Sequence, residues 1–176
     1  MMDFSQEITR VLEASLLKEV DFVPVKPDDL EAPYRDLLDH GRDMTSTLAK
    51  FHGKNISLKV LRASRIGDKY LREVILYSGE KPVEYGLIEV HLNHYRDDLR
   101  ERILAETEPL GCILNDSEIA YESKPVGFLK ISSGEFSPDF FPPAGGESLF
   151  GRYNSLFDES DRVIARILEI LPRERP

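Results

Sequence analysis

The sequence predicts an α+β domain with an antiparallel β-sheet and flanking helices. Apolar residues recur at helical spacing through the first third of the chain, and from Asn55 their period changes to two, as in strands. Helices followed by mostly consecutive strands are typical of α+β folds. The 176 residues, 41% hydrophobic and 31% charged, fit one domain with a core of its own. We therefore expect a single domain over residues 1–176.

Three helices are predicted before the strands begin. Residues 8–17 have helical spacing, with Ser5 as the predicted N-cap. The two prolines of VDFVPVKP interrupt this pattern, and a second helix is expected from about Pro27. Asp43 is expected to cap a third helix, DMTSTLAKFHG, and Gly53 to end it.

An antiparallel meander is predicted in the middle of the chain. Its strands are NISLKVLRAS, KYLREVILY and VEYGLIEVHL, with a turn at Gly67-Asp68 between the first two and the turn SGEKP between the last two. The segment HYRDDLRERILAETE then returns to helical spacing and is expected to end before Pro109.

The C-terminal third is expected to complete the sheet. Two short strands are predicted near residues 118–123 and 126–131, and GRYNSLF and RVIARILEIL are expected to form a hairpin that turns at 158–161. Between them, residues 132–149 are rich in proline, glycine and phenylalanine, which is typical of a long irregular loop. We expect this loop to be a flap with an apolar underside.

Composition argues against several classes of protein. With 23 Lys and Arg against 32 Asp and Glu, the net charge of −9 disfavours nucleic acid as a partner, although buried arginines could still hold a small anion. The apolar stretches are too short for a membrane-spanning helix, and no secretory signal is visible. The single cysteine, Cys112, suits a reduced, cytoplasmic location. The sequence has no metal-ligand pattern and no phosphate-binding loop, so we expect neither a metal nor another cofactor.

Two charged residues are predicted to lie on apolar strand faces. Because successive side chains of a strand point to opposite faces, Arg72 shares a face with Val74, and Glu169 shares one with Ile167. A buried charge without a partner is costly. Either the two residues form a structural ion pair or lie on exposed faces, or they line a pocket in which Arg72 binds an anion and Glu169 meets a polar group. In such a pocket, desolvation would raise the pKa of Glu169, which suits proton transfer.

The other charged strand residues are mostly predicted to be solvated. Glu84 and Glu89 lie on opposite faces of the third predicted strand, so at least one of them should face solvent. Four arginines are expected at exposed strand edges, namely Arg62, Arg65, Arg152 and Arg166.

Four segments, in order, resemble segments of chorismate pyruvate-lyases. YLREVILYSGEKPVEYG resembles the strand–turn–strand segment of that family, DMTSTLAKFHG its Met-Thr helix, EPLGCIL its Pro-Leu-Gly segment, and GRYNSLF with ILEILP its closing hairpin. The match covers residues 43–172 and leaves residues 1–42 as an N-terminal helical extension. This extension and the long loop at 132–149 depart from the better-known bacterial lyases.

The resemblance implies a fold, a site and a reaction. The fold is an antiparallel sheet with a buried ligand pocket under flaps, and the reaction is the cofactor-independent cleavage of chorismate to 4-hydroxybenzoate and pyruvate. In this reading Arg72 binds the carboxylate of 4-hydroxybenzoate, and Glu169 meets its 4-hydroxyl and assists proton transfer. Backbone groups at Met44 and Leu110 also contact the ligand. The partner is then a small aromatic carboxylate.

Other functions stay open beside this one. Effector domains of some bacterial transcription regulators share a lyase-like fold and bind small ligands without chemistry, so the chain could be a non-catalytic sensor. About 40 residues precede the matching region, and they are acidic and interrupted by proline. We expect them to be too few and too acidic to form a DNA-binding domain. The sensor would then be free-standing. A related lyase acting on another aromatic carboxylate would use the same Arg72. A purely structural pairing of Arg72 and Glu169 would imply no site at all.

Overall fold

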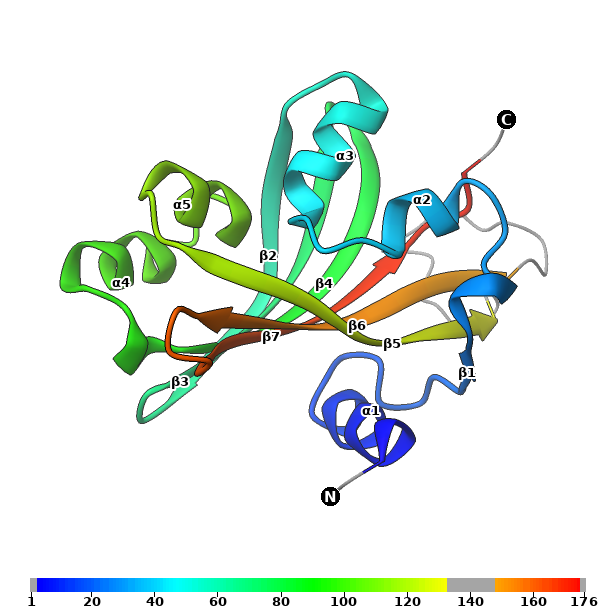
Figure 1. Ribbon diagram of the computed structural model, residues 1–176, viewed down its shortest axis with the longest axis horizontal. Coiled ribbons are helices and arrows are strands. Elements are labelled where there is room, and N and C mark those ends of the chain that lie inside the picture. The colour runs from blue at the N-terminus through cyan, green and yellow to red at the C-terminus, as the bar shows by residue number, and fades with distance from the viewer. Residues whose placement is uncertain (1–2, 133–147, 175–176) are drawn as a thin grey trace.

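A seven-stranded antiparallel sheet organises the chain, and the predicted α+β fold is confirmed (Figure 1). The computed structural model describes residues 3–132 and 148–174. The strands are β1 (Phe22–Val25), β2 (Ile56–Ile66), β3 (Lys69–Ser78), β4 (Lys81–His91), β5 (Tyr121–Ser132), β6 (Ser148–Asp158) and β7 (Val163–Leu171), paired in the order β1-β5-β6-β7-β4-β3-β2. The helices are α1 (Phe4–Glu13), α2 (Tyr34–Leu38), α3 (Met44–His52), α4 (Asp97–Leu104) and α5 (Leu110–Asp116), with 3₁₀ turns η1 (Pro27–Asp29) and η2 (Leu92–His94).

Most of the predicted elements form. The meander is β2, β3 and β4, and the closing hairpin is β6 and β7, both as predicted. Asp43 caps α3 by accepting a hydrogen bond from the Ser46 N–H, and Gly53 ends the helix at a φ of 67°. The N-cap of α1 is Asp3, not Ser5, because Asp3 makes the reciprocal bonds of a capping box.

The N-terminal segment differs from the prediction in two places. The expected second helix is divided into the turn Pro27–Asp29 and the helix α2, with Pro33 just before the helix. The proline-containing segment VDFVPVKP, expected only to interrupt the helices, contains the strand β1, which pairs with β5 at the edge of the sheet. An edge strand tolerates Pro24, which cannot donate to a ladder. Residues 1–42, expected to be helical, therefore also contribute a strand.

The C-terminal third differs as well. The two short strands are one strand, β5, whose register shifts between Pro125 and Gly127. Helix α5, which the pattern did not predict, begins immediately after Pro109. The predicted loop at 132–149 falls almost entirely on 133–147, outside the described residues.

Each face of the sheet is covered by helices and buries its own apolar layer. Helices α2, α3, α4 and α5 cover one face, and α1 lies on the other (Figure 1). The strand period explains the division, because Val74 and Leu76 belong to the layer under α2–α5, whereas Ile75 belongs to the layer under α1. Arg72 therefore points to the face with four helices, and Glu73 to the face of α1.

A buried glutamate fixes the N-terminal segment on the α1 face. Glu73 is 1% exposed, and its Oε1 accepts hydrogen bonds from the Leu16 N–H at 2.6 Å and from the Tyr85 hydroxyl at 2.5 Å. Its Oε2 lies 2.7 Å from Nη2 of Arg62. One side chain of β3 thus holds the chain after α1 and connects it to β2 and β4.

We expect Glu73→Ala to lower the free energy of unfolding by about 3 kcal/mol, because it removes the buried acceptor of the Leu16 and Tyr85 hydrogen bonds and the partner of Arg62. Urea denaturation followed by circular dichroism measures the loss. The matched control is Glu80→Ala, in the exposed β3–β4 turn, which should change stability by less than about 0.5 kcal/mol. Equal effects of the two substitutions would contradict the role of Glu73.

Candidate functional site

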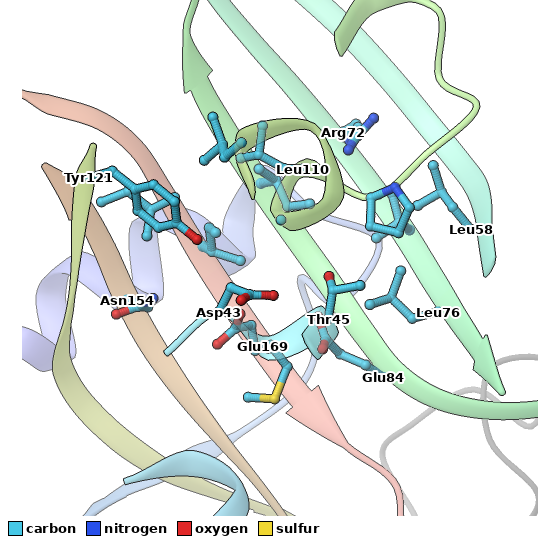
Figure 2. Close-up of a pocket in the computed structure, with 18 residues that line it drawn as sticks. Asp43, Thr45, Leu58, Arg72, Leu76, Glu84, Leu110, Tyr121, Asn154 and Glu169 are labelled. Atoms are coloured by element: carbon cyan, nitrogen blue, oxygen red, sulfur yellow. The ribbon is translucent and has the colours of Figure 1, made fainter. Parts of the chain in front are cut away.

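A cavity lies between the sheet and the starts of helices α3 and α5 (Figure 2). It encloses about 500 Å³, including its opening to solvent, and most of its lining is apolar. Apolar cavities with a few polar groups are typical of small-molecule sites. All four residues predicted for the site line this cavity, namely Met44, Arg72, Leu110 and Glu169.

Strand register builds the floor of the cavity. One row of paired residues crosses β3, β4, β7 and β6 as Arg72, Ile88, Ile167 and Asn154, and the next row crosses them as Val74, Gly86, Glu169 and Arg152. Neighbouring strands lie about 4.8 Å apart with a rise of about 3.4 Å per residue, so the Cα atoms of Arg72 and Glu169 are about 12 Å apart. A small ligand fits between two side chains so placed.

Arg72 is a buried cation without an anionic partner. The residue is 0% exposed, and its Nη2 donates a 3.2 Å hydrogen bond to the backbone oxygen of Glu108. Its Nε and Nη1 have no hydrogen-bond partner, and within the described ranges no carboxylate forms an ion pair with it. Burial lowers the pKa of Arg72, while nearby Tyr70 and Glu106 act in the opposite direction. A buried guanidinium is costly until an anion meets it, and its free N–H groups suit a carboxylate.

Glu169 pairs with Arg152 and not with Arg72. Both members of the pair are buried, and Nε of Arg152 donates to Oε2 of Glu169. Burial raises the pKa of Glu169, and the charge and hydrogen bond of Arg152 oppose that rise. The interpretation in which Arg72 and Glu169 form a structural ion pair is therefore wrong.

The prediction that Arg152 is solvated at a strand edge is also wrong, since it is 0% exposed. Arg62 and Arg65 are exposed as predicted because β2 is an edge strand, whereas β6 is flanked by β5 and β7. Arg152 also donates hydrogen bonds to the backbone oxygens of Leu38 at 3.0 Å, His40 at 2.9 Å and Arg42 at 3.2 Å, and its Nη1 lies 3.3 Å from Nδ1 of His40. The side chain thereby attaches the segment between α2 and α3 to the sheet.

Glu84 is a site residue that the sequence reasoning did not single out. It lines the cavity, is 3% exposed, and its Oε2 has no hydrogen-bond partner. Burial raises the pKa of Glu84 well above its usual value, the charge of Glu169 raises it further, and Arg152 opposes the rise. The sequence signal that could have identified Glu84 is the strand period, which places it on the same face as the apolar Ile88. Glu89, on the opposite face, is only half-buried.

Gly86 leaves room in the floor of the cavity beside Val74 and Glu84. A Cβ at this position would lie 3.1 Å from Cγ2 of Val74 and 3.2 Å from Oε1 of Glu84. Both distances are shorter than ordinary van der Waals contacts, so a larger residue would fill the floor of the cavity. The carboxyl group of Glu84 therefore lies over Gly86, beside the strand that carries Glu169.

The helices over the cavity present their first residues to it. Met44 begins α3 after Asp43, and Leu110 begins α5 after Pro109. Backbone N–H groups in the first turn of a helix have no acceptor within that helix. The two helix starts lie close together, because a Cβ on Gly111 would be 2.8 Å from Oδ1 of Asp43. Figure 2 shows Leu110 above the space between Arg72 and Glu169.

Residues 3–132 and 148–174 contain no group of three or more His, Cys, Asp and Glu side chains placed to hold a metal ion. Within the same residues, every helix is too short or too polar to cross a membrane.

Comparisons with known proteins show a likeness in fold. No family model and no curated protein matches the sequence. The effector domain of PhnF from Mycobacterium smegmatis has a TM-score of 0.58 at 14% identity, over 76% of this chain and 90% of that domain. A gene product of Staphylococcus aureus subsp. aureus N315 has a TM-score of 0.56 at 10% identity, over 77% and 90%. YydK from Bacillus subtilis subsp. subtilis str. 168, a possible transcriptional regulator, has a TM-score of 0.52 at 7% identity, over 69% and 59%.

At such low identity these likenesses establish the fold alone. The fold of this chain is similar to that of the PhnF effector domain. Since YydK is described as a regulator, the comparisons give no support to the prediction that nucleic acid is absent among the partners.

We expect Glu84→Gln to stabilise the protein at neutral pH. The folded-state pKa of Glu84 is raised above the unfolded value of about 4.3, so the folded chain binds this proton more tightly than the unfolded chain. That contribution is complete below the unfolded pKa and is lost as pH rises through the folded pKa. Differential scanning calorimetry from pH 4 to pH 8 should show the melting temperature of the variant increasingly above that of the wild type.

Glu80→Gln, at an exposed turn, is the control for this series and should follow the wild type at every pH. A gap between Glu84→Gln and the wild type that does not change with pH would contradict the buried titration.

Proposed function

We propose that this chain is a non-catalytic binding domain, of the sensor type, for a small organic carboxylate. The observation that carries the proposal is Arg72, a fully buried cation with two unpaired nitrogen atoms in an apolar cavity. Desolvated guanidinium groups without partners are costly, and charge-assisted bonds to a carboxylate remove that cost. The likeness to the PhnF effector domain supports binding without a chemical step.

The lining of the cavity suggests the body of the ligand. The walls between Arg72 and Glu169 are mostly aliphatic, with Leu110 over the space and Ile88 in the floor. An aromatic ring or a short hydrocarbon body fits such walls. An aromatic carboxylate, as the resemblance to chorismate pyruvate-lyases implies, is the proposed class of ligand.

The other proposed roles follow from position. Glu169 meets the end of the ligand remote from the carboxylate, held in place by Arg152. Met44 and Leu110 contribute the first turns of two helices, whose backbone N–H groups are available to a ligand.

We expect Arg72→Gln to weaken the binding of 4-hydroxybenzoate at least about tenfold, the effect of losing a charged hydrogen bond. Arg72→Lys should restore only part of the affinity, because a compact ammonium does not reproduce the geometry of a guanidinium. Isothermal titration calorimetry measures both. Arg65→Gln, on the exposed edge strand, is the matched control and should bind as the wild type does.

The ligand-free melting temperature separates binding from folding in this experiment. Because Arg72 is buried without an anionic partner, Arg72→Gln should melt no lower than the wild type in the absence of ligand. Undiminished affinity in Arg72→Gln would refute the proposed anion site.

One observation favours a second candidate, chorismate pyruvate-lyase. Glu84 and Glu169 line the same cavity as Arg72, and Arg152 stabilises the charge of only one of them. Two carboxyl groups in different environments can divide the roles of proton donor and acceptor. Arg72 would then orient chorismate for the loss of pyruvate.

Incubation with chorismate distinguishes the two candidates. Chromatography for 4-hydroxybenzoate and pyruvate should show no more product with the wild type than with Arg72→Gln, which corrects for the spontaneous decay of chorismate. Both products above that background would replace the binding function by the lyase.

A further inference from the structure

The proposed carboxylate site at Arg72 leaves one feature of the cavity unexplained. Glu84 is 3% exposed, and its Oε2 has no hydrogen-bond partner. Buried polar atoms in folded proteins are nearly always paired, and an unpaired one costs about 1–3 kcal/mol. The atom belongs to a side chain that lines the cavity.

The groups that face Glu84 leave it without a cation. From β7 it faces Glu169 and from β6 Arg152, whose nitrogen atoms bond to Glu169 and to three backbone oxygens. Before α3 lies Asp43, which accepts bonds from the Ser46 N–H at 2.8 Å and from Nδ2 of Asn115 at 3.1 Å.

The strands on the other side contribute only apolar groups. Leu76 of β3 pairs with Glu84, and Leu58 of β2 pairs with Leu76. Among the described residues, this carboxyl group is therefore faced by two acidic side chains and by Arg152, which is already bonded to Glu169, while Arg72 lies two rows of the sheet away. The neutral carboxylic acid is the form that such surroundings favour, and it carries one O–H donor.

One oxygen of this carboxyl group lies over a glycine. Oε1 of Glu84 lies over Gly86, 3.2 Å from where a Cβ would be, and Gly86 is paired with Glu169 on the next strand. A ligand atom over Gly86 is thus adjacent to Glu84 and one row of the sheet, about 7 Å along the strand direction, from the row of Arg72, whereas Glu84 itself is two rows, about 13 Å, from that row.

We propose that Glu84 determines specificity in this cavity by holding, through a hydrogen bond, an uncharged hydroxyl or carbonyl oxygen at the end of the ligand remote from its carboxylate. This inference rests on the proposed function, since Arg72 must first fix the carboxylate. A second carboxylate at the remote end would lie against Glu169 and is rejected. A ligand without any oxygen there leaves the proton of Glu84 without an acceptor and binds less tightly.

Isothermal titration calorimetry at pH 7 with benzoate, 3-hydroxybenzoate, 4-hydroxybenzoate and terephthalate tests the proposal. The wild type should bind one of the two hydroxybenzoates about tenfold more tightly than benzoate. It should bind terephthalate more weakly than benzoate. Glu84→Leu should bind benzoate as well as the wild type does and reduce the hydroxybenzoate preference to less than about twofold. Glu84→Gln, whose amide also donates, should keep most of the preference.

Two further variants complete the series. Glu89→Gln changes a carboxylate on the opposite face of the same strand and should leave all four affinities unchanged. Glu84→Met is a second apolar substitution, to be used if Glu84→Leu does not fold.

The outcomes distinguish this inference from the proposed function. An unchanged hydroxybenzoate preference in Glu84→Leu or Glu84→Met overturns the role of Glu84 while the carboxylate site stands. If the wild type binds terephthalate more tightly than the other three compounds, the role of Glu84 is likewise overturned and the carboxylate site stands. Failure of the wild type to bind any of the four compounds overturns the proposed aromatic carboxylate site and this inference with it.

Discussion

The buried ion pair between Arg152 and Glu169 is the interaction on which the cavity depends. It joins two neighbouring central strands, and Arg152 also holds three backbone oxygens of the segment between α2 and α3. That segment leads into Asp43, the cap of α3, and so sets where Met44 meets the cavity. Because the pair satisfies its own charges, the cation left for an anionic ligand in this cavity is Arg72. Loss of one partner would leave the other charge buried and alone, which is the expensive case.

Adjacent residues of β3 carry out separate tasks on the two faces of the sheet. Glu73 binds the N-terminal segment under α1, and Arg72 points the opposite way into the cavity. The same strand thereby fixes the scaffold and supplies the candidate anion site. A slip of one residue in the pairing of β3 would exchange the two side chains and destroy both. The extensive pairing of β3 with β2 and β4 therefore fixes the register of β3 as well as stabilising the sheet.

The sequence contained enough to predict the meander, the closing hairpin and the faces of Arg72 and Glu169, because a period of two is local information. It did not contain the order of the strands, and Arg152 was misjudged for that reason. Its strand is central because the preceding strand, β5, pairs with its other edge and β1, distant in sequence, lies outside β5. Short elements such as β1 and α5 have too few residues for a period to be read, and prolines conceal both. Met44 and Leu110 came from the family resemblance and from no pattern of their own.

The hydrogen bond from Arg72 to the Glu108 backbone connects the interior of the protein to its surface. The Glu108 side chain is held by two bonds from Arg102 on α4, and the same connection between α4 and α5 contains Glu106 at a φ of 59°, a conformation that few non-glycine residues adopt. An anion bound at Arg72 would compete with the backbone oxygen of Glu108 for this guanidinium. The bonds from Arg102 to Glu108 would then place the effect of the anion next to α4, on the outside of the protein.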